Sequence, residues 1–289
     1  MQRKITQNRP QPKLPDLVGA QGSLEPSQGA GSMQAHSNRR RMLTVDRTDT
    51  AMKTTLRIPG NWSHPGELIE RMPPGFRLTP ETLILPDGVE IEFAPMPPDD
   101  QFVRIFESSC RRPATADELE IVREYTVNVG LTGPCGSMQA ATTMMQAGAA
   151  IVRAGAAGVF IDNSGLAHGG GDWIEMAEED SPDALSFAFV AIVRGQSEVW
   201  TMGMHVLGLR DIVMQRRDVE PDGDKIIEVI RYLCSSDKSI DDGHWLADEV
   251  GPRFQVVATS SDEFDAASPM HNPFGRLKLV SMKDIAERN

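Results

Sequence analysis

The stretch "YTVNVGLTGPCGSMQAATTMMQAGAAIVRAGAAGVFIDN", residues 125–163, contains the pattern that decides the fold. Apolar residues occupy every second position from Tyr125 to Leu131, which is typical of a strand. A glycine-containing loop follows at 132–136, then an alanine- and methionine-rich helix at 137–155, and then "AGVFI", a short apolar strand typical of one buried on both faces. This order predicts a βαβ crossover. If the two strands are neighbours and parallel, both following loops leave the same edge of the sheet.

The stretch "DNSGLAHGGGDW", residues 162–173, follows the second strand and combines acidic, amide, hydroxyl and imidazole groups with glycines. We predict a turn between a strand that ends at Asp162 and the helix "WIEMAEE", which Asp172 is placed to cap. Gly169 to Gly171 allow backbone angles closed to other residues, at an entropic cost that a passive turn avoids. That cost is the reason to consider a ligand at this loop.

The remaining patterns alternate between helical and strand-like segments. The predicted elements are a helix near 64–71 capped by Ser63, a hairpin at 81–93 around "PDG", a strand at 101–107, a helix opened by a Thr115–Glu118 capping box, an apolar hairpin at 184–203, an amphipathic helix at 223–236, and strands at 254–259 and 276–281. Together they predict an α+β fold: a mixed β-sheet with hairpins and one βαβ crossover, covered by helices.

The first 51 residues differ in composition from the rest. They are rich in Gln, Pro, Gly, Ser, Asn and Arg and lack apolar periodicity, so we predict a disordered N-terminal arm. Residues 1–50 carry a net charge of +4 and the remainder −16. We expect the arm to be dispensable and residues 52–289 to form a single α+β domain. Either Met1 or Met52 can be the native start.

Several classes of function are disfavoured by composition. A net charge of −12 without clustered Lys and Arg argues against nucleic-acid binding. No apolar run is long enough to span a membrane, and no secretory signal is evident, so a cytoplasmic location is expected. The three cysteines are far apart and form no Cys-x-x-Cys pair, so neither disulfides nor a zinc site is expected. No metal is predicted, and no cofactor is indicated.

Two glycine loops and one later histidine supply the candidate ligand-binding residues. If both loops leave one sheet edge, ligands are expected there, where helix N-termini offer free N–H groups. We predict that Asp162, Asn163 and His168 face the "TGPCGS" loop, residues 132–137. The candidates are Cys135, Ser137, Asp162, Asn163, Ser164, His168, Asp172 and His205.

The same residues allow several interpretations. The helix start at Ser137 would suit an anion, and Cys135 would be a thiolate nucleophile with His168 as its base, oriented by Asp162 or Asp172. Metal binding by His168, Asp162, Asp172 and His205 lacks a supporting spacing. In the structural interpretation, Asp162 and Asn163 bond turn amides with help from Ser164, and His168 fills a polar pocket. No catalytic residue is assigned.

From residue 125 onward the order of segments resembles the bacterial family known as domain of unknown function 4261. The resemblance covers roughly residues 81–260 and rests on "GVF", "GLAH", "DWIEM", the apolar hairpin and "TMGMHVLGL". Met202 and Leu207 depart from the Thr and Phe of the family pattern, and the triple glycine replaces its Ser-Pro. The resemblance implies a soluble bacterial α+β domain with no established activity.

Two functions of different classes follow. The first is a non-catalytic binding or interaction domain, whose partner, a protein or a small molecule, is unknown. The alternative is a small-molecule enzyme with a site between the "TGPCGS" and "DNSGLAHGGGD" loops. Convergence of the candidate side chains in a concave pocket would favour the enzyme, and a scatter of satisfied turn residues would favour the binding domain.

Overall fold

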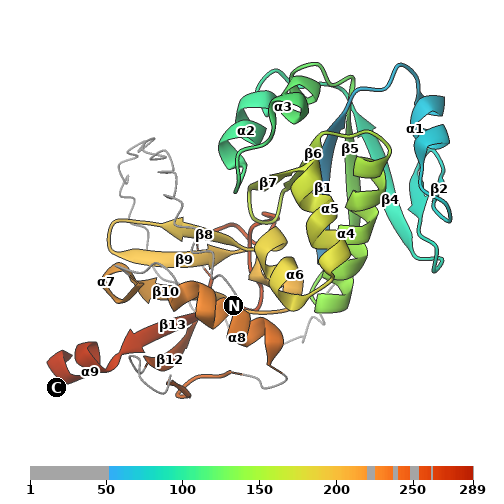
Figure 1. Cartoon of the computed structure of the whole chain (residues 1–289). Helices are drawn as coiled ribbons and strands as arrows, with labels where there is room; N and C mark the ends of the chain where they lie inside the picture. The colour runs from blue at the N-terminus through green and yellow to red at the C-terminus, as the bar shows by residue number, and fades with distance from the viewer. Residues whose placement is uncertain (1–51, 220–224, 237–239, 248–253, 262, 289) are drawn as a thin grey trace, which may run out of the picture. The chain divides into compact units, whose positions relative to one another are not determined.

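The computed structural model describes residues 52–219, 225–236, 240–247, 254–261 and 263–288 (Figure 1). Its internal contacts divide the chain into Met1–Thr50 and Ala51–Asn289, and every described residue belongs to the second unit. The predicted disordered arm lies outside the described residues. Within them the fold is α+β, with two sheets and helices packed against them.

The first sheet has seven strands in the order β2-β3-β4-β5-β1-β6-β7, and its neighbouring strands pair antiparallel. Its strands are β1 (Lys53–Gly60), β2 (Arg77–Leu78), β3 (Thr82–Ile84), β4 (Glu90–Met96), β5 (Val127–Pro134), β6 (Gly158–Ile161) and β7 (Leu166–Gly169). The predicted hairpin at 81–93 is formed by β3 and β4.

The crossover from β5 to β6 passes over an intervening strand. β1 pairs antiparallel with both, so β5 and β6 run in the same direction but are not neighbours. The assumption that they would be adjacent is therefore wrong. Leu56 and Ile58 of β1 are fully buried, so the apolar face of β1 contributes to the core between β5 and β6. The two loops still leave the same edge, since the parallel direction is retained.

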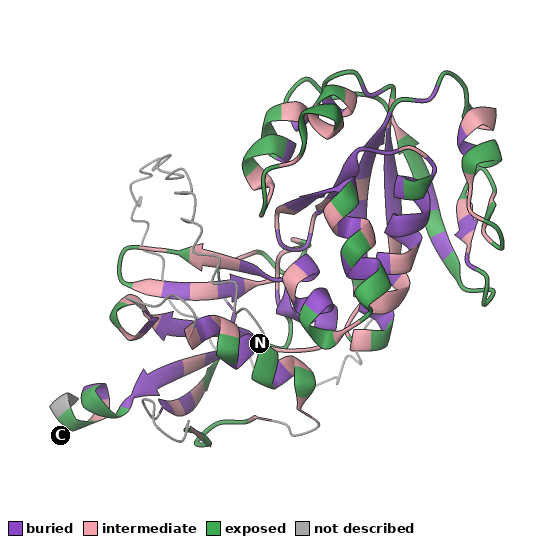
Figure 2. Cartoon of the chain, viewed as in Figure 1, coloured by how far each residue is buried: buried purple, intermediate pink, exposed green. Residues whose placement is uncertain are grey.

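Helix α4 (Met138–Arg153) covers the face of the sheet that carries Leu56 and Ile58 (Figures 1 and 2). Ser137 caps it through its side chain, as the sequence predicts. Its small residues allow close packing: a Cβ on Gly148 would lie 2.9 Å from Nε1 of Trp173 on α5 (Gly170–Glu179). The helix predicted at 137–155 is thus confirmed, and it is deeply buried.

The opposite face is covered near β6 and β7 by α2 (Phe102–Ser109) and α3 (Ala116–Arg123). The predicted strand at 101–107 is wrong, because Phe102 and Phe106 are four residues apart and face the sheet together from one side of a helix. The predicted capping box of Thr115 and Glu118 is confirmed. The short helix α1 (Pro65–Arg71) is capped by His64 rather than by Ser63, whose hydroxyl bonds the Glu67 carboxylate.

The second sheet has six strands in the order β11-β12-β13-β10-β9-β8, and among the described residues only its β10–β13 pair is parallel. Its elements and those around it are α6 (Pro182–Phe189), β8 (Ala191–Arg194), β9 (Glu198–Met202), the 3-10 turn η1 (Met204–Leu207), β10 (Asp211–Gln215), α7 (Arg216–Val219), α8 (Lys225–Ser235), β11 (Trp245–Leu246), β12 (Phe254–Thr259), β13 (Arg276–Ser281) and α9 (Met282–Arg288). The strands predicted at 254–259 and 276–281 are confirmed.

The apolar segment at 184–203 is only partly the predicted hairpin. β8 and β9 form its second half, whereas the first half belongs to α6, which Ser181 caps and Pro182 opens. The Ser-Pro-Asp sequence is a helix start, and the apolar residues that follow are buried as a helix instead of a strand. One hydrophobic cluster includes residues of both sheets.

The "DNSGLAHGGGDW" stretch contains a strand that the sequence did not indicate. Residues 162–165 form a turn, β7 follows and pairs with β6, and α5 starts after Gly169. The predicted direct turn from strand to helix is therefore wrong, and so is Asp172 as its cap, since the N-cap residue is Gly169. Across the described ranges, no helix combines the length and apolarity needed to cross a membrane.

Candidate functional site

The ends of β5 and β6 meet the η1 turn at one edge of the first sheet. The Gly136 amide donates to the Val206 carbonyl at 3.1 Å. Gly208 has a φ of +79°, and a Cβ on it would lie 2.5 Å from the Gly136 carbonyl oxygen, so only glycine permits this approach. We use the name edge cluster for the side chains at this joint, which are Thr54, Cys135, Asn163, Ser164 and His205.

The Asn163 side chain extends the sheet beyond the end of β6. Its Oδ1 accepts from the Thr55 amide at 3.0 Å and its Nδ2 donates to the Lys53 carbonyl at 3.1 Å, as a neighbouring strand would. Nδ2 also lies 3.2 Å from the Pro269 carbonyl and 3.1 Å from Nε2 of His205. The Lys53 and Pro269 carbonyls match the two amide hydrogens of Asn163, and Oδ1 accepts from Thr55, so both polar atoms of this buried side chain are engaged.

Cys135 and His205 are close but are not arranged as a nucleophile and its base. The Cys135 thiol lies 3.7 Å from the backbone carbonyl of His205. Burial lowers the pKa of His205 to about 4 and raises the pKa of the Cys135 thiol. Both groups are therefore neutral near pH 7, and a nucleophilic thiolate is disfavoured at this position.

His168 lies at the other end of the β6–β7 hairpin, opposite Val159. Its fully buried ring donates from Nε2 to the Ala188 carbonyl at 3.0 Å. Burial, and next the nearby Arg111 guanidinium, lower its pKa to about 3. The ring contacts Trp173 and Phe187, so the prediction that His168 faces the "TGPCGS" loop is wrong.

Arg111 and His168 donate hydrogen bonds to backbone carbonyls at the C-terminal end of α6. Arg111 donates to the Phe187 carbonyl at 2.6 Å and to the Val190 carbonyl, beside the bond that His168 makes to Ala188. The last carbonyls of a helix lack intrahelical partners and carry partial negative charge, so donors stabilise them. The buried position of His168 is therefore explained by its structural role at the end of α6.

The two aspartates of the quoted loop form ion pairs. Asp162 accepts from Arg57 at 2.7 Å, and Asp172 lies 3.4 Å from Arg112. Neither carboxylate bonds the turn amides that the sequence interpretation assigned to Asp162. The structure brings neither to the edge cluster, whereas Cys135, Asn163, Ser164 and His205 gather there and Ser137 caps α4 beside them.

The triple glycine is explained by close packing against Glu118. Its Oε1 accepts from the Gly171 amide at 2.9 Å, and a Cβ on Gly169 would lie 2.5 Å from its Oε2. A Cβ on Gly170 would lie 2.9 Å from Val152. A carboxylate of the chain itself therefore takes the favourable position at the N-terminus of α5, where an anionic ligand was considered.

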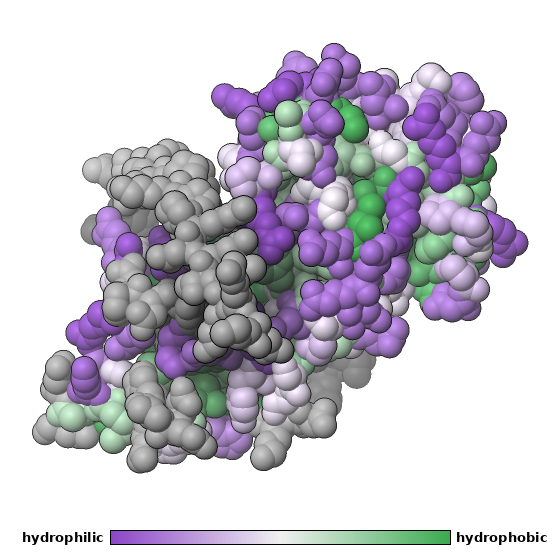
Figure 3. Space-filling view, in the orientation of Figure 1, coloured by the Kyte–Doolittle hydropathy of each residue, from purple (hydrophilic) through white to green (hydrophobic). Residues whose placement is uncertain are grey.

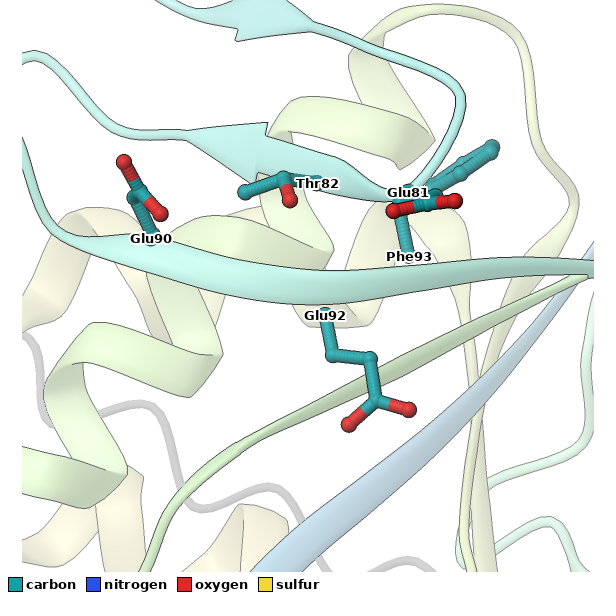
Figure 4. Close-up of a pocket in the computed structure, with 5 residues that line it drawn as sticks. All are labelled: Glu81, Thr82, Glu90, Glu92 and Phe93. Atoms are coloured by element: carbon teal, nitrogen blue, oxygen red, sulfur yellow. The ribbon is translucent and has the colours of Figure 1, made fainter.

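A surface recess of about 510 Å³ lies elsewhere, on the β3–β4 hairpin (Figure 4). It is open to solvent and is lined by Glu81, Thr82, Glu90, Glu92 and Phe93. Lys53 already pairs with Glu92 at 3.1 Å. This recess is not among the sites predicted from the sequence, although the alternation in "VEIEF" places Glu90 and Glu92 on the same face of a strand.

Removing the Asn163 side chain is expected to weaken the edge cluster. We expect Asn163→Ala to lower the free energy of unfolding by about 2–4 kcal/mol, because the Thr55 amide and the His205 ring lose their partner in a buried setting. Asp162→Ala should cost about 1 kcal/mol or less, since it removes a partly exposed ion pair. Urea denaturation measures both, and equal losses would contradict the role given to Asn163.

Comparison of the chain with protein-family models, with curated proteins and with solved structures finds no match. The resemblance to domain of unknown function 4261 therefore stays a prediction. In the part of the chain that the structure describes, no group of three or more His, Cys, Asp or Glu side chains is placed to hold a metal ion.

Proposed function

We propose that the chain is a non-catalytic binding domain that holds a cationic segment of a protein partner at the recess on β3 and β4. One observation carries the first half of this proposal: the Cys135 thiol lies against the His205 carbonyl and not against a base, and both Cys135 and His205 are neutral near pH 7. The sheet edge therefore lacks the paired nucleophile and base that a covalent reaction would need.

The recess supports the second half. Among the described residues, no ion pair engages Glu81 or Glu90, and Glu92 shows how an ammonium group is held there through Lys53. Residues 51–289 carry a net charge of −16, which favours approach of a basic partner. The described residues in view in Figure 3 are mostly hydrophilic, with separate hydrophobic spots.

The alternative, a small-molecule enzyme between the two glycine loops, has less support. Of its residues, Cys135, Asn163 and His205 are neighbours, but His168 lies apart from them. A cytoplasmic location, a bacterial source and the lack of a nucleic-acid partner remain proposals, which rest on composition and on the family resemblance.

Neutralising the recess should weaken binding of a cationic probe. We expect Glu81→Gln/Glu90→Gln to raise the Kd for a hexalysine peptide by about fivefold at low salt, since each exposed ion pair contributes roughly 0.5 kcal/mol. Calorimetric titration of the full chain measures this. The matched control is Glu120→Gln/Glu175→Gln, which makes the same change in net charge at exposed positions elsewhere.

The control separates local from general attraction. If it weakens the peptide as much as the recess variant does, the peptide responds only to total charge and the recess is not the site. Unchanged affinity in the recess variant would overturn the proposal equally.

A further inference from the structure

The second sheet buries one of its faces in the core. Ile212, Met214 and Leu279 belong to the main hydrophobic cluster, together with the apolar residues of α8 (Figure 1). Side chains alternate along a strand, so the residues between these three point to the opposite face. We call this second surface the outer face and define it by Val193, Glu198, Trp200, Val213, Val257 and Lys278. Neither hydrophobic cluster of the described residues includes any of them.

The outer face carries an apolar row centred on a tryptophan. The strand pairings place Val193 and Val213 on the two sides of Trp200, with Lys278 and then Val257 beyond Val213. Val193, Trp200 and Val257 each keep part of their surface exposed. An indole ring buries a large apolar area, and tryptophan is enriched at the centres of protein interfaces. Such a row on an acidic domain is typical of a surface that binds another protein.

The charges of the outer face indicate which partner fits it. Lys278 donates to Glu198 at 2.7 Å, so the face carries one charge of each sign. Residues 51–289 carry a net charge of −16, so the rest of the surface is acidic and repels a second copy of the chain. The outer face has no net charge and does not. A two-fold axis between Lys278 and Glu198 places each of them opposite its counterpart in the second copy, so the face is complementary to itself.

From this geometry we propose that two copies of the chain pair through their outer faces. The two sheets pack face to face about 10 Å apart, as in a β-sandwich, with the Trp200 rings near the centre of the interface. Six strands about 4.8 Å apart, each about five residues long, give a footprint of roughly 400 Å² per copy. A standard interface buries about 800 Å² per partner, so this dimer is weak, with a Kd on the order of 10 μM.

Sedimentation equilibrium of the full chain tests whether two copies pair. As the protein concentration rises from about 1 μM to about 300 μM, the mean mass should increase from that of one chain toward that of two, because a micromolar Kd lies within this range. The mass should not rise beyond two chains, since a two-fold interface is closed. The mass of a single chain over the whole range would overturn the proposal without any variant.

Two charge reversals test whether the outer face is the interface. Lys278→Glu gives the face two negative charges and Glu198→Lys gives it two positive charges, so each variant alone should dimerise at least about tenfold more weakly. An equimolar mixture of the two should associate again, because their faces then carry opposite charges.

Mixing two variants cannot repair a defect within one chain, so recovery in the mixture identifies a contact between copies. The control is Glu120→Lys, which makes the same charge reversal at an exposed position elsewhere and should dimerise as the parent does. Circular dichroism checks that each variant is folded. Parental dimerisation of both reversals, or no association when the two folded variants are mixed, would refute the outer face as the interface.

Discussion

Ala149→Glu is expected to abolish folding. Ala149 lies in the middle of α4, fully buried in the core cluster between the first sheet and the neighbouring helices. A carboxylate there would be unpaired in an apolar setting, at a cost of several kcal/mol, which is comparable to the roughly 5–15 kcal/mol stability of a typical domain. We expect circular dichroism to show loss of the cooperative thermal transition. Ala141→Glu, also fully buried, should behave in the same way.

The same helix provides the matched control. Gln139 is exposed in the first turn of α4, where a carboxylate interacts favourably with the helix dipole. Gln139→Glu should therefore stay within about 0.5 kcal/mol of the parent protein. Near-native stability of Ala149→Glu would mean that α4 does not pack as described.

The burial of α4 could be predicted from its residue types. The small side chains of Ala and Gly bury apolar surface only when the helix lies very close to its neighbours. The two terminal strands at 254–259 and 276–281 could be predicted for a similar reason, since their apolar residues alternate. The strand prediction at 101–107 misreads the period, because the apolar residues Phe102, Val103, Ile105 and Phe106 have the spacing of a helix face. The segment is helical because only one face of the sheet is available to it, and a helix packs Phe102 and Phe106 together against that face.

The position of β1 could not be derived from local pattern. Its insertion between β5 and β6 is a pairing over long sequence distances, with Leu56 opposite Leu131 on one side and Ile161 on the other. No strand is predicted at residues 53–60 from the sequence, and the neighbours that β1 pairs with depend on the packing of the whole core. β5 and β6 nevertheless end at the same edge of the sheet, as predicted, because this requires only that the two strands run in the same direction.

The candidate residues separated for the same reason. "GLAHG" contains β7, which reverses the chain, so His168 ends at the opposite edge from Asn163 although only five positions separate them. His205, far along the chain, is the histidine that meets Asn163. Glu118 was identified through its capping box, yet its contact with Gly171 depends on how α3 and α5 pack and has no local signature.

Acidification is expected to destabilise the protein mainly through two buried histidines. The pKa values of His168 and His205 fall from 6.5 to about 3 and about 4 on folding, since burial disfavours the imidazolium. Their contribution to stability is complete above pH 6.5 and is lost as the pH falls toward those folded-state values. At pH 5 each ring should account for a loss of about 2 kcal/mol relative to pH 7.5.

Asp211 opposes this trend. It accepts from Thr201 and Asn272, but burial dominates and raises its pKa from 3.8 to about 6. A raised carboxyl pKa contributes stability at low pH that is lost as the pH rises through 6, so acidification to pH 5 returns about 1 kcal/mol. The net loss between pH 7.5 and pH 5 is therefore expected to be about 2–3 kcal/mol, measured by urea denaturation at the two pH values.

His168→Gln distinguishes titration of this ring from a general effect of acid. The glutamine amide retains a donor for the Ala188 carbonyl but takes up no proton, so the variant should lose about 2 kcal/mol less than the parent between pH 7.5 and pH 5, even though its stability at pH 7.5 is lower. A His168→Gln curve parallel to that of the parent would show that the ring does not titrate in this range, and the acid response would then have to come from surface charge.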